Sequence, residues 1–166
     1  GVHFYQKAGG DGFVPGLMHE DLGGYHVADI EFSAAFDVDR SKVGKDLSEA
    51  IFVEPNNTCK FREVPHLGVP VSRGMTHDGL GYYLKQRVSK ADGATSNVVG
   101  ILRDTGTDVL VNFLPVGSEM ATKWYIEQVL DAGCGLVNCI PVFIAREAYW
   151  QGRFQERGLP VIGDDI

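Results

Sequence analysis

The chain has 166 residues, 44% hydrophobic and 22% charged, which is the composition of an ordinary globular protein of one domain. Its net charge of −7 argues against non-specific binding to nucleic acid and against an anionic membrane surface. No apolar run approaches the roughly 20 residues that span a bilayer. The three cysteines show no CxxC spacing, which favours reduced thiols and a cytoplasmic location.

The first half of the chain predicts two strands and one clear helix. Val2–Lys7 has the pattern of the tail of a helix, and a glycine-rich stretch follows it. Val27–Phe36 is apolar enough for a buried strand, with acidic residues at its carboxyl end. Ser41 is placed to cap a helix over Lys42–Phe52, and prolines confine the next strand to Val69–Ser72.

The second half alternates helices with strands. Residues 74–88 predict a loop that leads into a helix, and a further helix runs from Thr95 or Ser96 to about Gly106. Amphipathic spacing predicts a helix over Ala145–Arg157, and Leu159–Ile162 predicts a last strand.

The stretch from Thr107 to Pro141 carries the strongest pattern in the chain. Asp108–Leu114 is a near-continuous apolar run, typical of a strand buried on both faces. A helix follows from Ser118, ends at Gly133, and leads into a second strand over Leu136–Ile140. This is a strand–helix–strand crossover, so we expect an α/β fold with a single Rossmann-like parallel sheet. Ligands of such sheets bind past the carboxyl ends of the strands.

Several residues could carry chemistry at that edge. Asp37 follows a buried strand, where a carboxylate either binds the ribose of a nucleotide or caps the next helix. Asn112 and Ser118 flank a turn whose amides either meet an anion or open a well-capped helix. Asp164 and Asp165 close the last strand as ligand-facing carboxylates or as a solvated turn.

Two other patterns predict little. Gly79–Leu84 imitates a GxGxxG dinucleotide motif, but Leu84 replaces the third glycine and no strong strand precedes it. The histidines lack the HExxH spacing of a zinc site, so we predict no metal site.

Long segments, taken in order, resemble the myo-inositol-1-phosphate synthases of bacteria and archaea. These segments are VPGLMHEDLGGYHVADIEFSAAFDVDRSKVGKDLSEAIF, RGMTHDGLGYY, DVLVNFLPVGSE, DAGCGLVNCIPVFIA and LPVIGDDI. The resemblance implies an enzyme with NAD on a modified Rossmann domain, which converts glucose 6-phosphate to inositol phosphate by internal oxidation and reduction. It also implies a homo-oligomer, a tetramer in full-length relatives.

The resemblance implies cofactor contacts along this chain. It places Asp37 at the adenosine ribose and Asp164 near the nicotinamide. The remaining cofactor-side positions that it implies are Asp46, Thr105, Asn112, Pro115, Gly117 and Tyr125.

Two parts of the family pattern have no counterpart in these 166 residues. One is the glycine-rich first strand and turn, and the other is the domain with the catalytic lysines. We therefore assign no catalytic residue, and we expect a partial NAD-binding domain that is inactive alone. We also expect an open central sheet edge that invites self-association. A non-catalytic nucleotide-binding or assembly module derived from the family is the alternative, and a simple NAD oxidoreductase is disfavoured because no acid–base pair stands out.

Overall fold

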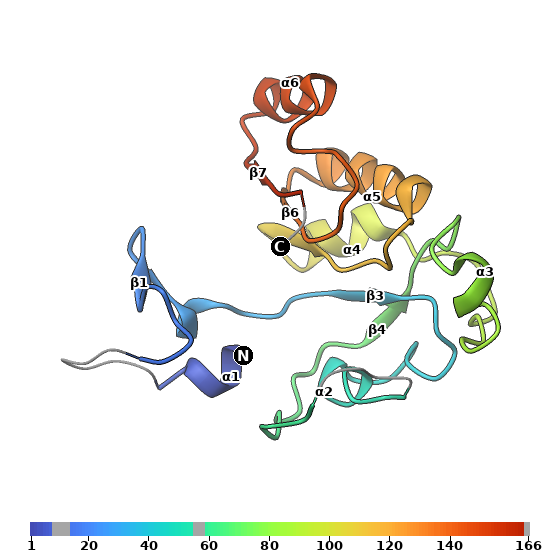
Figure 1. Cartoon of the computed structure of the whole chain (residues 1–166), viewed down its shortest axis with the longest axis horizontal. Coiled ribbons are helices and arrows are strands. Elements are labelled where there is room, and N and C mark those ends of the chain that lie inside the picture. The colour runs from blue at the N-terminus through green and yellow to red at the C-terminus, as the bar shows by residue number, and fades with distance from the viewer. Residues whose placement is uncertain (8–13, 55–58, 165–166) are drawn as a thin grey trace.

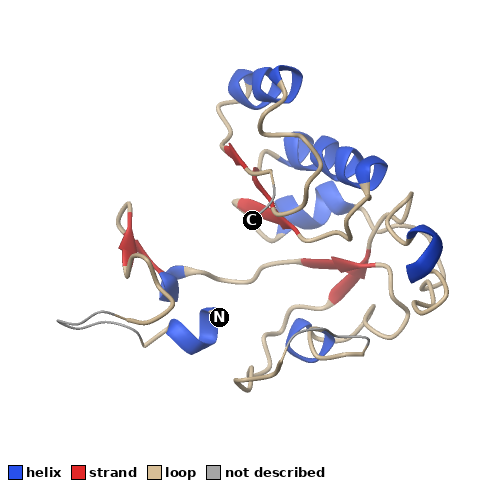
Figure 2. Cartoon of the chain, viewed as in Figure 1, coloured by secondary structure: helices blue, strands red, loops and turns tan. Residues whose placement is uncertain are grey.

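A computed structural model describes residues 1–7, 14–54 and 59–164, so Asp165 lies outside the described residues (Figure 1). Short strands and helices alternate along most of the chain (Figure 2). In chain order they are α1 (Val2–Tyr5), β1 (Asp21–Leu22), β2 (Tyr25–His26), the 3-10 helix η1 (Val27–Asp29), β3 (Ala35–Asp37), α2 (Leu47–Ala50), β4 (Val71–Arg73), α3 (Gly81–Leu84), α4 (Val98–Asp104), β5 (Val109–Asn112), α5 (Glu119–Ala132), β6 (Gly135–Asn138), α6 (Ala148–Glu156) and β7 (Val161–Ile162).

The strands form two parallel ladders and one small antiparallel pair. β3 pairs with β4, and β5, β6 and β7 form a three-stranded parallel sheet. β1 and β2 form the antiparallel pair. The predicted α/β class with parallel pairing is confirmed. The expectation of a single sheet is wrong, because β3 and β5 do not pair in the described part of the chain.

One helical layer covers one face of the three-stranded sheet. α4 and α5 pack together there, and their apolar sides meet the sheet and α6 in the main core. Fully burying a valine, leucine, isoleucine or phenylalanine side chain in this core contributes about 1.5–3 kcal/mol relative to leaving it exposed. The least exposed members of this core are Val98, Leu102, Ile126, Val129, Leu130, Cys134, Leu136, Ile144 and Phe154.

α5 follows its sequence prediction closely. It begins just after Ser118 and ends at Ala132, and the next residue, Gly133, is left-handed with a φ of 86°. That conformation disfavours residues with a Cβ atom, so glycine ends the helix where the sequence placed its end. The predicted strands on either side are confirmed as β5 and β6, which pair in parallel from Val109↔Gly135 to Asn112↔Asn138.

The region before β4 differs from its prediction. Val27–Asp29 form the 3-10 helix η1, and only Ala35–Asp37 of the predicted strand pair with a neighbour. Apolar composition favours extended backbone, but a ladder also needs a partner strand, which the sequence pattern does not supply. The predicted helix over Lys42–Phe52 shrinks to α2, which is capped by Asp46 rather than by Ser41.

No helix in the described ranges is long and apolar enough to cross a membrane.

Candidate functional site

Two buried asparagines join β5 and β6 at the carboxyl edge of the sheet. Asn112 and Asn138 lie opposite each other in the parallel register, and Asn112 Nδ2 donates to Asn138 Oδ1 at 2.9 Å. Asn112 Nδ2 also lies 3.2 Å from Thr122 Oγ1 on α5, and its Oδ1 accepts the Leu114 N–H at 3.0 Å. Leaving a buried amide without partners costs about 1–3 kcal/mol, so these bonds fix how the chain leaves β5. The sequence indicated Asn112 as a site residue but not Asn138.

Asp164 extends this network to the loop after β6. It accepts Asn138 Nδ2 at 2.9 Å and the N–H groups of Ile144 at 2.8 Å and Ala145 at 2.9 Å. A longer bond of 3.3 Å comes from the Arg146 N–H. Burial alone would raise the pKa of Asp164, but the Asn138 amide and these backbone donors outweigh it and lower that pKa. The carboxylate therefore serves as an ionised anchor for residues 144–146.

Gly163 permits this arrangement because β7 passes very close to β6 there. A Cβ atom at Gly163 would lie 2.5 Å from the Asn138 carbonyl oxygen, and the φ of 144° is one that other residues rarely adopt. The small residue before Asp164 therefore lets the carboxylate reach Asn138.

The amino end of α5 is occupied by a carboxylate from another segment. Asp78, in the loop after β4, accepts the N–H groups of Met120 at 2.8 Å and Ala121 at 2.9 Å. Burial would raise the pKa of Asp78, but these two donors outweigh it and lower the pKa. The sequence left open whether the amides at the start of α5 bind an anion or belong to a capped helix. The structure shows a capped helix, because Asp78 already accepts the N–H groups of Met120 and Ala121. Sequence reasoning missed Asp78, which lies 42 residues before the helix that it caps.

Pro115 and Gly117 form the turn between β5 and α5. The Pro115 carbonyl accepts the Ser118 N–H at 3.1 Å and the Ser118 hydroxyl at 2.5 Å. Ser118 is 1% exposed, so its side chain holds this turn instead of capping the helix.

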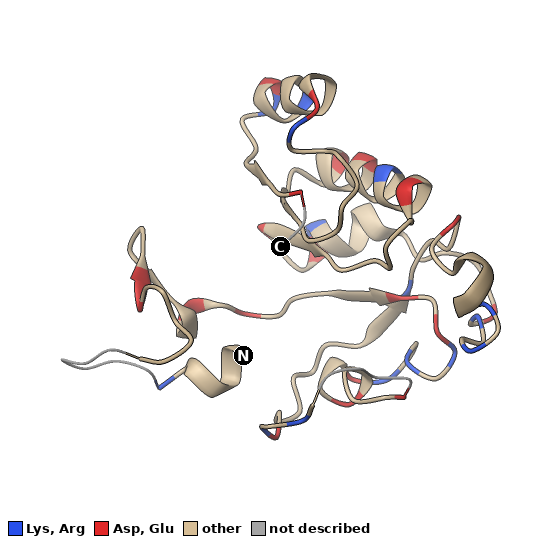
Figure 3. Cartoon of the chain, viewed as in Figure 1, with Lys and Arg blue, Asp and Glu red and all other residues tan. Residues whose placement is uncertain are grey.

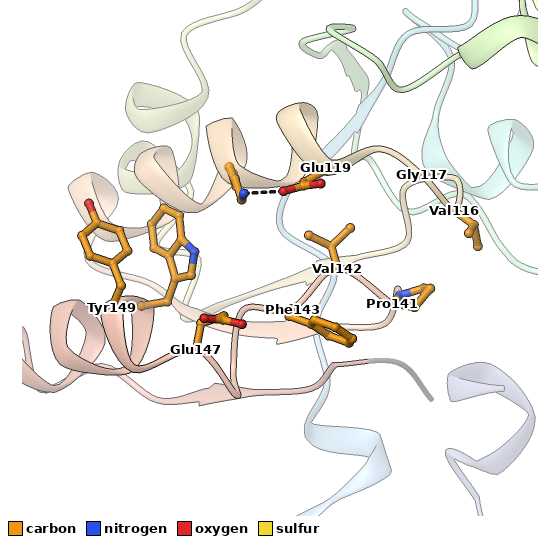
Figure 4. Close-up of a pocket in the computed structure, with 10 residues that line it drawn as sticks. Val116, Gly117, Glu119, Pro141, Val142, Phe143, Glu147 and Tyr149 are labelled. Atoms are coloured by element: carbon orange, nitrogen blue, oxygen red, sulfur yellow. Dashed lines mark hydrogen bonds and ion pairs between the residues drawn. The ribbon is translucent and has the colours of Figure 1, made fainter.

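A hollow of about 550 Å³ lies beside this turn, between the loops after β5 and β6 and the start of α6. Glu119 and Glu147 lie on opposite sides of it (Figure 4). Lys123, the one cationic residue in the lining, is paired with Glu119. The full lining consists of Val116, Gly117, Glu119, Lys123, Pro141, Val142, Phe143, Glu147, Tyr149 and Trp150.

Tyr125 ties α5 to the end of β4. Its hydroxyl oxygen accepts the Met75 N–H at 3.1 Å, and its ring centroid lies 6.3 Å from that of Phe36 on β3. Burial raises the pKa of Tyr125 to about 12. Together with Asp78, this contact places the carboxyl end of the β3–β4 pair beside the helix that follows β5.

Asp37 lies at the carboxyl end of β3 and is half-buried. Its Oδ1 accepts the N–H groups of Val38 at 2.7 Å and Asp39 at 2.9 Å, while its Oδ2 lies 3.4 Å from Lys42 Nζ. It caps no helix, because α2 is capped by Asp46. One oxygen thus shapes the local turn and the other has a single ionic neighbour.

Asp46 and Thr105 do not join this edge. Asp46 is buried and accepts Ser48 N at 3.0 Å, Leu67 N at 3.1 Å and Val69 N at 2.9 Å. The Ser48 hydroxyl and these amides hold the pKa of Asp46 below its usual range despite its burial. Thr105 is the C-cap of α4, where its hydroxyl donates to the Ile101 carbonyl at 2.8 Å, before β5 begins. Thr105 therefore lies at the amino end of that strand.

The GxGxxG-like segment lacks the setting of a dinucleotide motif, as its sequence indicated. α3 is four residues long and begins at Gly81, eight residues after β4 ends at Arg73. Within the described ranges, no three His, Cys, Asp or Glu side chains gather as they would around a metal ion.

Comparison with known proteins gives no matching family model but several close relatives. The chain is 49% identical over all 166 residues to the inositol-3-phosphate synthase of Mycolicibacterium smegmatis. It is 48% identical over the same length to the inositol-3-phosphate synthases of Corynebacterium glutamicum and Mycobacterium tuberculosis. Along its whole length, this chain is related to the inositol-3-phosphate synthases. The resemblance inferred from the sequence is thereby confirmed.

The chain spans about half the length of the curated relatives that it matches, 46% of the Mycolicibacterium protein and 45% of the Mycobacterium tuberculosis protein. Among solved structures, the crystal structure of Ari2 matches with a TM-score of 0.81 and 31% identity. That match covers 99% of this chain and 47% of Ari2. The α/β fold described above is therefore shared with a solved protein over nearly all of the chain.

Proposed function

We propose that this chain is the NAD-binding part of an inositol-3-phosphate synthase, an enzyme of the cytoplasm that acts on glucose 6-phosphate. The observation that carries the proposal is the relation to the named synthases, at about 48% identity along all 166 residues. In that role residues such as Asp37 and Gly117 would hold NAD, which would supply reversible hydride transfer with the sugar. The whole enzyme would be a homo-oligomer.

The geometry at the carboxyl edge supports the cofactor assignment. Among the residues that the structure describes, one carboxylate oxygen of Asp37 has only Lys42 as an ionic neighbour, and a carboxylate oxygen can accept a ribose hydroxyl. Asn112 is the last residue of β5, and Gly117 lies past it, in the turn that leads into α5. Because Asp78 occupies the Met120 and Ala121 amides, the amino end of α5 is not where we place the pyrophosphate.

In this proposal some residues of the chain hold a loop in position, and others bind the ligand. Asn138 and Asp164 hold the loop at residues 144–146, which keeps the wall of the 550 Å³ hollow in place. That hollow carries carboxylates and a single lysine already paired with Glu119, so it suits an uncharged part of a ligand better than a phosphate. We assign to these residues binding and positioning, and no proton or hydride transfer.

Activity and cofactor binding can be tested separately. The chain alone, incubated with glucose 6-phosphate and NAD, is expected to give no inositol phosphate above a blank, because no catalytic residue is assigned to it. A chimera of the Mycolicibacterium smegmatis synthase that carries these 166 residues in place of its own matching segment is expected to form the product. A correctly folded chimera that neither binds NAD nor forms inositol phosphate would contradict the proposed function.

A further inference from the structure

The turn after β3 fixes the direction in which the Asp37 carboxylate points. Oδ1 of Asp37 accepts the N–H groups of Val38 at 2.7 Å and Asp39 at 2.9 Å. Asp39 holds the next part of the turn, because its own Oδ1 accepts the Ser41 N–H at 2.8 Å and the Ser41 hydroxyl at 2.7 Å. The turn therefore sets the position of Oδ2, the oxygen of Asp37 that is left to meet a ligand.

The ammonium group of Lys42 lies next to that oxygen. Lys42 Nζ is 3.4 Å from Asp37 Oδ2, and the side chains of Lys42 and Asp37 are 27% and 32% exposed. Lys42 also lines a hollow of about 110 Å³ together with Leu47, Ala50 and Val71, so its apolar stem packs beside α2 and β4. A ligand that binds Oδ2 therefore meets a positive charge whose position the packing restricts.

The other cations nearby are engaged elsewhere. Lysines and arginines gather on the turn after β3 and on the loop after α3 (Figure 3), namely Arg40, Lys42, Lys45, Lys85, Arg87 and Lys90. Arg40 pairs with both carboxylate oxygens of Asp92, at 2.9 Å and 2.8 Å. Arg73 lies opposite Asp37 in the β3–β4 register, but it is 8% exposed and donates to two backbone carbonyls. Among the described residues, Lys42 is thus the cation in ionic contact with Asp37.

The pairing of Asp37 with Lys42 bears on which dinucleotide the site prefers. NADP differs from NAD by a phosphate on the 2′-oxygen of the adenosine ribose, and a carboxylate that accepts the 2′-hydroxyl repels that phosphate. A cation beside the carboxylate attracts the phosphate and offsets part of the repulsion. We propose that Lys42 sets the discrimination between NAD and NADP at Asp37, and that its charge makes this discrimination weaker than Asp37 alone would impose. The inference rests on the proposed binding of NAD at Asp37.

The test uses the chimeric Mycolicibacterium smegmatis synthase that carries these 166 residues, as parent and as Lys42→Met. Methionine keeps the apolar stem and removes the charge. Calorimetric titration gives the Kd of NAD and of NADP for each protein. The Kd of NADP is expected to rise about tenfold in the variant, whereas the Kd of NAD should change little. An unchanged ratio of the two Kd values would overturn the inference, and so would a parent that binds NAD but no NADP at millimolar concentration.

Two further variants separate the contact from general effects of charge and folding. Lys45→Met removes the same charge from an exposed residue of the same turn and should leave the ratio of the Kd values as in the parent. Lys42→Arg keeps the charge and should also preserve the ratio. A shift in Lys45→Met as large as that in Lys42→Met would assign the effect to overall charge and contradict the role of Lys42.

A separate outcome concerns the proposed function. If the folded parent chimera does not bind NAD, the proposed function fails and this inference fails with it. If NAD binds and only the ratio is insensitive to Lys42, the proposed function stands and the role of Lys42 alone is wrong. Melting of each protein without cofactor shows whether it is folded, and Lys42→Gln replaces Lys42→Met if the methionine variant is not.

Discussion

Asp164 and Asp37 both follow parallel strands, but their hydrogen bonds differ. Asp164 uses both oxygens, with the Asn138 amide and three backbone N–H groups of the loop after β6. Asp37 uses Oδ1 for its own turn and leaves Oδ2 3.4 Å from Lys42. A carboxylate whose acceptor sites are all engaged holds the fold, whereas one with an oxygen to spare can still bind a ligand.

The same contrast separates Asp37 from two further aspartates, Asp46 and Asp78. Asp46 and Asp78 each collect backbone N–H groups from segments distant in sequence, as Asp164 does. Their cost of burial is offset by those donors, which explains why the pKa of each is lowered. Among the predicted carboxylates, Asp37 is therefore our candidate for ribose, and Asp46 and Asp164 are expected to act on the fold.

The largest expected effect is on stability, from Asp164→Ala. Removing the carboxylate leaves Asn138 Nδ2 with its carbonyl partners alone and strips the Ile144 and Ala145 N–H groups of their acceptor. Each lost bond to a charged group is worth about 1.5–3 kcal/mol, and water can replace part of that, so we expect a loss of about 3 kcal/mol. Urea unfolding followed by tryptophan fluorescence measures it.

Asp164→Asn is the matched control, because it keeps one acceptor oxygen and nearly the same shape. Its loss should be clearly smaller than that of Asp164→Ala. If both variants unfold at the urea concentration of the parent, Asp164 does not anchor the loop, and its distinction from Asp37 disappears.

The sequence predicted the second half of the chain well because its segments carry their own signals. α5 has an apolar period, a turn before it and Gly133 after it, all within 17 residues of Gly117. β5 and β6 are short apolar runs on either side, and adjacent strands joined by one helix pair in parallel. Local pattern and final structure therefore agree on the elements of this stretch. The prediction that the first strand is buried on both faces is wrong, because Val109 and Val111 of β5 are 44% and 47% exposed.

The predictions that were wrong or incomplete concern residues whose structure depends on contacts with segments distant in sequence. Val27–Phe36 is apolar, yet most of it has no neighbouring strand and therefore forms no ladder. Asp78 caps a helix 42 residues later, and no local spacing signals that contact. Asn138 lies within the predicted strand Leu136–Ile140, but its role depends on its register with Asn112 and on Asp164, which only the fold brings together.

The next effect is on NAD affinity, from Asp37→Asn in the chimeric synthase. The amide keeps the Oδ1 acceptor that shapes the turn and removes the charge and one acceptor from the other position. Losing charge-assisted bonds to ribose should cost about 2 kcal/mol, which is about thirtyfold in affinity. Calorimetric titration of NAD gives the affinity, and melting without cofactor gives the stability.

Asp92→Asn is the control for Asp37→Asn, since Asp92 pairs with Arg40 on the exposed surface. NAD affinity should be unchanged in this variant. Equal NAD affinity in the parent and the Asp37 variant, together with a lowered melting temperature, would leave Asp37 with a structural role only.

A smaller effect is expected from Asp78→Ala at the amino end of α5. The change removes the acceptor of the Met120 and Ala121 N–H groups and a favourable charge at the positive end of the helix dipole. Loss of such a cap costs about 1 kcal/mol. Asp131→Ala, at the other end of the same helix, should be neutral or slightly stabilising, because the dipole has the opposite sign there.

The contribution of the Asp78 cap to the free energy of unfolding should also depend on pH, and this is the smallest effect that we expect. Its folded pKa is lowered, so its contribution is fully present above the unfolded pKa of about 3.9 and is lost as pH falls through the folded pKa. The difference in unfolding free energy between the parent and Asp78→Ala should therefore hold steady from about pH 7 to pH 5 and shrink below about pH 4. Urea unfolding of both proteins across that range measures it. A difference that grows as the pH falls would mean that the ionised carboxylate does not cap α5.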